Sequence, residues 1–223
     1  MIRPIKNVLT TSRVQSLRQL IAHGQFEDGK NTAGWHAQGV KTNLQWQAKD
    51  DIAEELNHAV AHALTSNPEF TALTYPKKMM PFIVSKSTNQ GGYGDHIDDA
   101  IMHNEELVRT DISCTIFLSD PNDYQGGELT MILGGVEMAY KLEAGDAIVY
   151  PSTTLHRVNP VTSGERLAVL TWIESLVSSP DKREILHDLD AARKTIMQQH
   201  GKTPEFDLIT KSHANLLRRW AIT

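Results

Sequence analysis

The chain has 223 residues, of which 40% are hydrophobic and 22% are charged, and this balance excludes a disordered polymer and fits one folded domain with helical additions. The net charge of -5 is spread along the chain, so we expect no nucleic-acid partner. The sequence contains neither a run of about 18 apolar residues nor the apolar N-terminal segment of a signal peptide, and we therefore expect a cytoplasmic protein without a membrane span.

Two helices are predicted in a support region that covers residues 1–79. The first begins at Thr10 or one of the two residues after it, which can cap a helix N-terminus, and it ends near Gly24. The second begins at Asp50, where negative charge favours the helix dipole, and it is bounded by Pro68. Both carry apolar residues at helical spacing, namely Val14, Leu17, Leu20 and Ile21 in the first and Ile52, Leu56, Val60 and Leu64 in the second.

From about Met80 the pattern changes to short apolar segments separated by turn-forming residues. Short strands at this spacing are typical of a double-sheeted jelly roll. We therefore predict an α+β protein whose core, residues 80–175, is a double-stranded β-helix. The predicted strands are Pro81–Ser87, Arg109–Leu118, Gly127–Leu133, Val136–Leu142, Ala147–Tyr150 and Leu167–Glu174.

The remaining residues, 176–223, are predicted to form a C-terminal helical extension. Ser179 and Pro180 are typical of a helix start, and Gly201 can end this helix. A second helix is predicted from Thr203 onward. The pair either folds back on the core or joins with a second copy of the chain to make a homodimer.

A candidate metal site lies in the stretch Tyr93-Gly94-Asp95-His96-Ile97-Asp98. Alternate side chains of a β-strand share a face, so His96 and Asp98 can bind one ion together, while Asp99 would face away. His156, which follows an apolar strand and a polar turn, is the candidate third ligand. Two imidazoles and one carboxylate leave one side of a metal open, as in non-haem Fe(II) oxygenases.

Arg166 is the candidate anion-binding residue. It would share a strand face with Ala168, Leu170 and Trp172, so it should point inward, and an inward arginine requires an anion. Tyr93 is either a packed aromatic residue or a further contact to that anion. We expect the loops formed by residues 30–45 and 101–108 to border the site.

These residues belong to motifs that resemble a known enzyme group, the Fe(II)- and 2-oxoglutarate-dependent dioxygenases of the prolyl 4-hydroxylase-like class, and within it the PKHD-type hydroxylases. The resemblance covers most of the chain and is strongest between Gly91 and Trp172. Besides the stretch that ends at Asp98, it rests on Phe117-Leu118-Ser119-Asp120-Pro121, Tyr124-Gln125-Gly126-Gly127-Glu128-Leu129, Pro151-Ser152-Thr153-Thr154-Leu155-His156-Arg157-Val158 and Gly164-Glu165-Arg166.

The resemblance implies Fe(2+) on His96, Asp98 and His156, and 2-oxoglutarate with its far carboxylate on Arg166. It implies that 2-oxoglutarate and dioxygen react with an unidentified peptidyl or small-molecule substrate, which is hydroxylated while succinate and CO2 are released. A requirement for L-ascorbate is implied in the same way. Prolyl 4-hydroxylases proper have lysine at the position of Arg166, and arginine keeps its charge while adding a bidentate fork.

Four other interpretations are considered. A cupin-like protein that binds a metal and a small acid without oxidising anything would need the same residues, and a purely structural β-sandwich would need none of them. Nucleic-acid demethylases of the same superfamily resemble the triad but carry a second arginine where this chain has Trp172. Asp98 argues against a halogenase, since halide needs that coordination position.

Overall fold

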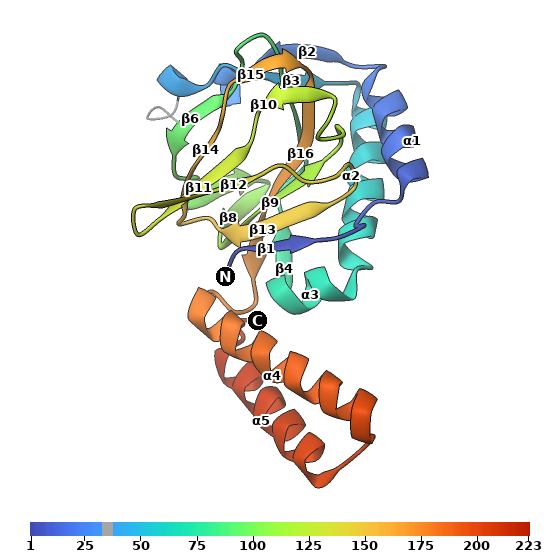
Figure 1. The fold of residues 1–223 in the computed structure, drawn as a ribbon, viewed down its shortest axis with the longest axis vertical. Helices are drawn as coiled ribbons and strands as arrows, with labels where there is room; N and C mark the ends of the chain where they lie inside the picture. The colour runs from blue at the N-terminus through green and yellow to red at the C-terminus, as the bar shows by residue number, and fades with distance from the viewer. Residues whose placement is uncertain (33–37) are drawn as a thin grey trace.

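Two antiparallel sheets pack face to face at the centre of the structure, a computed structural model that describes residues 1–32 and 38–223 (Figure 1). The larger sheet has the strand order β1-β13-β9-β16-β5-β3-β2, with β4 also paired to β16. Its strands are β1 (Arg3–Ile5), β2 (Gln25–Asp28), β3 (Leu44–Gln47), β4 (Pro76–Met79), β5 (Ile83–Ser87), β9 (Ile112–Phe117), β13 (Ala147–Pro151) and β16 (Arg166–Ser175).

The smaller sheet has the order β12-β11-β14-β6 and closes the other side of the sandwich. Its strands are β6 (Tyr93–His96), β11 (Leu129–Leu133), β12 (Val136–Tyr140) and β14 (Leu155–Val158). Two further strand pairs flank the sandwich, formed by β7 (Ile101–Asn104) with β8 (Glu106–Arg109) and by β10 (Tyr124–Gly126) with β15 (Val161–Gly164). This arrangement is the predicted jelly roll.

The alternation of side chains along the central strands separates two hydrophobic cores. On β16, Leu167, Val169 and Ile173 belong to the core on the outer face of the large sheet, whereas Arg166 and Trp172 line a pocket on its inner face. A smaller core fills the space between the two sheets beside this pocket, with Phe117, Leu129, Met131, Ile148 and Tyr150 as its buried members.

Helices cover the outer face of the large sheet. Helices α1 (Thr11–Ile21) and α2 (Asp50–Thr65) contribute buried residues to the outer core, and α3 (Pro68–Thr74) follows them (Figure 1). The Thr10 side chain caps α1 by accepting a hydrogen bond from the backbone N–H of Arg13. Two short 3-10 helices, η1 (Gly29–Thr32) and η2 (Gln38–Val40), lie between β2 and β3 in the chain.

The C-terminal helices α4 (Pro180–His200) and α5 (Pro204–Trp220) pack against each other and project from one end of the sandwich (Figure 1). Their ends follow the predicted cues, because Ser179 and Thr203 cap the N-termini and Gly201 lies at the end of α4. Across residues 1–32 and 38–223, no helix has the length and apolar character that crossing a membrane requires.

The predicted helices and the six predicted strands are present, with ends shifted by a few residues. The sequence failed to predict the four strands before Met80, because β1, β2, β3 and β4 have only three or four residues each and their apolar alternation is short. It also failed to predict α3, where Pro68 begins a new helix instead of only ending α2, and the hairpin formed by β7 and β8.

Candidate active site

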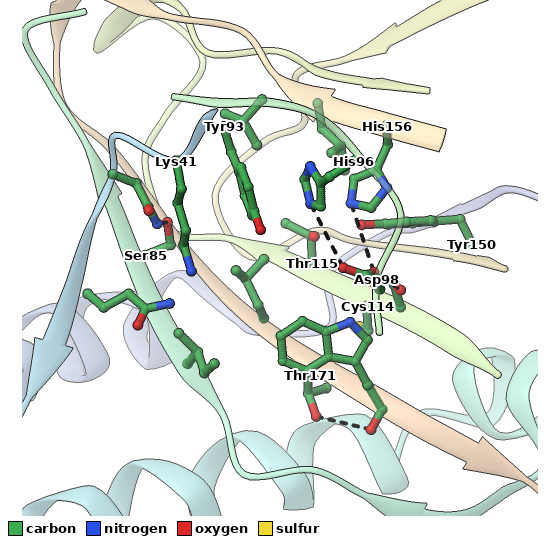
Figure 2. A pocket seen from close by; sticks show the side chains of 18 of the residues that line it. Lys41, Ser85, Tyr93, His96, Asp98, Cys114, Thr115, Tyr150, His156 and Thr171 are labelled. Carbon is green, nitrogen blue, oxygen red and sulfur yellow. Dashed lines mark hydrogen bonds and ion pairs between the residues drawn. The ribbon is translucent and has the colours of Figure 1, made fainter. Parts of the chain in front are cut away.

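The three predicted metal ligands meet at one edge of the small sheet. His96 ends β6 and His156 lies in β14, and the two residues are direct partners in the antiparallel register of these strands. Asp98 follows two residues after His96. One potential ligand atom from each side chain lies within 4.8 Å of the other two, and Asp98 Oδ1 and Oδ2 lie 3.9 Å from His96 Nε2 and His156 Nε2, respectively (Figure 2).

Backbone contacts orient both imidazoles with Nε2 toward Asp98. The Nδ1 atoms of His96 and His156 lie 2.7 and 2.9 Å from the carbonyl oxygens of Gly94 and Thr154. A carbonyl only accepts hydrogen bonds, so Nδ1 donates in both rings, and the neutral form of either ring has its lone pair on Nε2. Burial lowers the pKa of His96 to about 4, and repulsion from His156 acts in the same direction. His96 is therefore neutral at pH 7, the form that binds a metal.

Ser113 holds the carboxylate of Asp98, and Ser152 contacts Ser113 in turn. Ser113 Oγ, on β9 of the large sheet, donates to Asp98 Oδ2 at 2.5 Å and lies 2.8 Å from Ser152 Oγ. Hydrogen bonds of this kind to a ligating carboxylate fix its orientation. The large sheet therefore fixes the acidic ligand, while the small sheet fixes the two imidazoles.

Two tyrosines enclose the imidazoles. The Tyr93 ring stacks on that of His96, with centroids 3.6 Å apart and an angle of 16° between the planes. Tyr150 approaches His156 edge-on at 5.0 Å. Burial raises the pKa of Tyr93 to about 12, with the charge of Asp98 as the second cause, so the phenol keeps its proton at neutral pH and can donate a hydrogen bond.

Arg166 is buried at the start of β16, with 1% of its surface exposed. Its guanidinium carbon lies 5.4 Å from the centre of the Phe117 ring, and its Nε and Nη2 atoms have no hydrogen-bond partner among the described residues. Burial lowers the pKa of Arg166 from its usual value, but a guanidinium stays protonated in proteins. A buried cation with two unused N–H donors is costly to the free protein, and an acidic ligand would satisfy it.

One pocket contains all five predicted site residues, Tyr93, His96, Asp98, His156 and Arg166. Its empty space, which includes the part open to solvent, is about 890 Å³. Asn43 and Gln45 from one expected border loop, and Met102 from the other, line this pocket. Residues 33–37 of the first loop lie outside the described residues.

Three details of the site differ from the sequence interpretation. Strand β6 ends at His96, so Asp98 is positioned by Ser113 instead of by strand alternation. His156 lies inside β14, not at the end of the preceding strand. Asp99 also lines the pocket, and its backbone oxygen accepts a hydrogen bond from the Thr110 hydroxyl.

The sequence interpretation missed Lys41, whose side chain enters the same pocket (Figure 2). Burial lowers the pKa of Lys41 to about 8, against the opposing effects of Asp98 and Asp28, so the amine is mostly protonated at pH 7. One sequence pattern could have predicted this residue: polar side chains at the alternate positions Lys41, Asn43 and Gln45, which lead into a strand and so share a face.

Comparison with known sequences gives two matching family models. Residues 82–174 match the 2OG-Fe(II) oxygenase superfamily. Residues 181–221 match the PKHD-type hydroxylase C-terminal domain. A PKHD-type hydroxylase of Colwellia psychrerythraea strain 34H is 62% identical over 223 residues, which cover 100% of both chains.

Comparison with solved structures gives the same fold at low sequence identity. A Pseudomonas putida prolyl-4-hydroxylase has a TM-score of 0.55 and 19% identity, over 78% of this chain and 92% of that one. HygX from Streptomyces hygroscopicus, solved with nickel and 2-oxoglutarate bound, has a TM-score of 0.56 and 12% identity, over 79% of this chain and 84% of that one.

Proposed function

Since the chain belongs to the PKHD-type hydroxylases of the 2OG-Fe(II) oxygenase superfamily, we propose that His96, Asp98 and His156 hold its iron and that Arg166 binds 2-oxoglutarate. Iron bound there would couple the oxidative decarboxylation of 2-oxoglutarate by dioxygen, which gives succinate and CO2, to the hydroxylation of a substrate C–H bond. The expected substrate is peptidyl or a small molecule.

The donor set fits the metal. Two neutral imidazoles and one carboxylate are the ligands of the facial triad that non-haem Fe(II) oxygenases use. Both imidazoles are held in the correct tautomer by backbone carbonyls, and Asp98 is held by Ser113. These residues would bind a metal ion from one side, and the side of the ion that faces the pocket would stay open to other ligands.

The observation that carries the proposal is the guanidinium of Arg166, whose Nε and Nη2 have no hydrogen-bond partner among the described residues and which lines the same pocket as this triad. A carboxylate can accept two parallel hydrogen bonds from a guanidinium, and the geometry selects an acid over a neutral ligand. We assign Arg166 to the far carboxylate of 2-oxoglutarate. Tyr93 would donate a further hydrogen bond to the co-substrate, since its protonated phenol lies in the pocket beside His96.

L-ascorbate is the expected reductant that keeps the metal in the ferrous state. A cytoplasmic location agrees with the single cysteine, Cys114, which is a buried free thiol. A homodimer through the C-terminal helices is supported by exposed apolar residues along them, namely Ile185, Met197 and Leu208.

The test is oxygen-dependent formation of succinate from 2-oxoglutarate by the purified protein with Fe(II) and ascorbate. Even without a substrate, we expect slow uncoupled turnover in the wild type and none in His96→Ala. A protein that only binds or senses a small acid would show no oxygen consumption above background. Full succinate production by His96→Ala would show that the ligand assignment is wrong.

A further inference from the structure

The indole of Trp172 carries an unused hydrogen-bond donor in the pocket. Its Nε1 atom is buried and has no hydrogen-bond partner among the described residues, although the side chain as a whole is partly exposed and lines the pocket. An N–H group that is removed from water without a partner is costly to the free protein. A residue that bears this cost in a pocket is a candidate for binding a ligand there.

The strand register places Trp172 next to the residues that would bind the metal. Trp172 on β16 is the direct partner of Ser113 on β9, and partners in antiparallel strands share a face, with Cβ atoms about 4.5–5.5 Å apart. Ser113 donates a hydrogen bond to the carboxylate of Asp98. Trp172 and Ser113 therefore form the part of the large sheet that lies against the metal-binding residues.

Arg166 lies at the other end of the pocket-facing side of β16. It precedes Trp172 by six positions, which correspond to roughly 20 Å along a strand. Arg166 is 1% exposed, whereas Trp172 is partly exposed, so the pocket is closed at Arg166 and opens toward Trp172. 2-Oxoglutarate, held by the metal and Arg166, would occupy the closed end. The primary substrate would therefore approach the metal from the side of Trp172.

The groups around Trp172 favour a neutral ligand atom. An indole N–H only donates hydrogen bonds, so its partner must be an acceptor. Asp99 is exposed, lines the pocket and follows Asp98 directly, and it places a second negative charge at this end of the pocket. This charge repels a carboxylate or a phosphate, but it does not repel a neutral carbonyl oxygen.

We propose that Trp172 Nε1–H donates a hydrogen bond to a neutral carbonyl oxygen of the primary substrate and so helps to place the reacting C–H bond beside the metal. The substrate is then an amide, either a peptide unit or a small molecule, and the recognised group is not a free acid. This inference rests on the proposed function, because it assumes that 2-oxoglutarate occupies the Arg166 end of the pocket.

The test observes the Trp172 N–H directly by proton–nitrogen correlation NMR of protein with isotope-labelled tryptophan. The protein is loaded with Zn(II) and 2-oxoglutarate, so that no turnover occurs. The chain has four tryptophans, and the indole signal that is missing from Trp172→Phe belongs to Trp172. The probes are N-acetyl amino-acid N-methylamides, which represent peptides, and neutral lactams, which represent small molecules. We expect at least one amide to shift the Trp172 N–H signal downfield, the direction that a new hydrogen bond produces.

Binding affinity gives a second, independent measurement. Each amide that binds is compared with its E-alkene isostere, which has the same shape without a carbonyl oxygen, and with the corresponding carboxylic acid. The wild type should bind the amide about 2- to 10-fold more tightly than the alkene, the usual effect of one neutral hydrogen bond. Trp172→Phe keeps an aromatic ring but has no N–H, so it should bind amide and alkene equally. The acid should bind no more tightly than the amide.

Trp46 provides the matched control, because its indole N–H is already used. Its Nε1 donates to the carbonyl oxygen of Ile21 at 2.7 Å, and Trp46 is not among the residues that line the pocket. The Trp46 signal should not respond to any probe, and Trp46→Phe should keep the preference for the amide over the alkene. Thermal unfolding of both variants shows whether they are folded.

Equal binding of amide and alkene to the wild type would overturn the inference, as would a preference that persists in Trp172→Phe. A panel in which no amide shifts the Trp172 signal, or in which the acid binds more tightly than the amide, would contradict the proposed substrate class. A downfield shift caused by Zn(II) and 2-oxoglutarate alone would place Trp172 on the co-substrate instead. Failure of the proposed function is distinct, since the wild type would then neither bind 2-oxoglutarate nor form succinate without a second compound.

Discussion

Replacing Arg166 by methionine should stabilise the ligand-free protein while removing its response to 2-oxoglutarate. The guanidinium is 1% exposed, and two of its nitrogens have no partner among the described residues. A buried unsatisfied donor costs about 1–3 kcal/mol, and an apolar side chain of similar volume in place of a buried charged group is worth roughly 1–4 kcal/mol. Methionine can pack against the Phe117 ring that now contacts the guanidinium.

The effect is large enough for a thermal melt. For a chain of this size, each kcal/mol changes Tm by about 2–4 °C, so the variant should melt at least about 2 °C above wild type. In the wild type with Zn(II), 2-oxoglutarate at 100 times its Kd should add about 2.7 kcal/mol of stability. In Arg166→Met this addition should fall to about 0.9 kcal/mol or less at the same 2-oxoglutarate concentration, because losing a buried charge pair costs about 2–5 kcal/mol, or roughly 30- to 5,000-fold in Kd.

Arg183 provides the control, because it is equally buried but satisfied. It is 4% exposed, and its Nη1 donates to the carbonyl oxygens of Val177 and Ser178 at 2.6 and 2.9 Å. Arg183→Met should therefore lower stability by about 1–3 kcal/mol. We therefore expect the two substitutions to change the stability of the ligand-free protein in opposite directions. If Arg166→Met lost stability as Arg183→Met does, Arg166 would be a structural residue and the co-substrate assignment would fail.

Three further predictions concern the metal ligands and the C-terminal helices. Ser113→Ala should weaken Fe(II) binding about 10- to 100-fold in anaerobic equilibrium dialysis, because Asp98 loses its hydrogen-bond donor; unchanged affinity would show that Ser113 does not position the carboxylate. In the metal-free protein, His96 has a pKa of about 4 when folded and about 6.5 when unfolded, so the unfolded state binds more protons between these values. The free energy of unfolding should therefore fall as the pH drops from 6.5 to 4. His96→Gln should make this fall smaller by on the order of 3 kcal/mol, as measured by urea unfolding at each pH. An identical pH profile in the variant would contradict this prediction. Leu208→Glu on α5, at a side chain that is 57% exposed, should convert a dimer to a monomer in sedimentation experiments, and a wild type that sediments as a monomer rules out the dimer.

Features that depend only on neighbouring residues in the sequence could be predicted from it. Arg166 was identified because alternation along one strand places it with Ala168, Leu170 and Trp172, and the structure shows Arg166, Leu170 and Trp172 lining the pocket. The helix ends at Ser179 and Gly201 follow from capping preferences of single residues. Strands of five or more residues with clear alternation were predicted for the same reason.

Residues whose role depends on contacts between distant segments could not be predicted. Ser113 bonds to Asp98, 15 residues earlier, only because β9 lies opposite the end of β6. His96 and His156 are register partners across β6 and β14, a pairing that no local pattern specifies. Lys41 enters the pocket because its backbone bridges to Tyr93. These three features depend on the packing of the two sheets.

Whether His96, Asp98 and His156 share one metal is decided by the number of Fe(II) ions bound per chain under anaerobic conditions. Equilibrium dialysis of the wild type should give one ion per chain, and His156→Ala should give none at the same free Fe(II) concentration while it still unfolds cooperatively. A His156→Ala protein that retains its ion with wild-type affinity would contradict the account, because the side chains from β6 and β14 would then not share one metal.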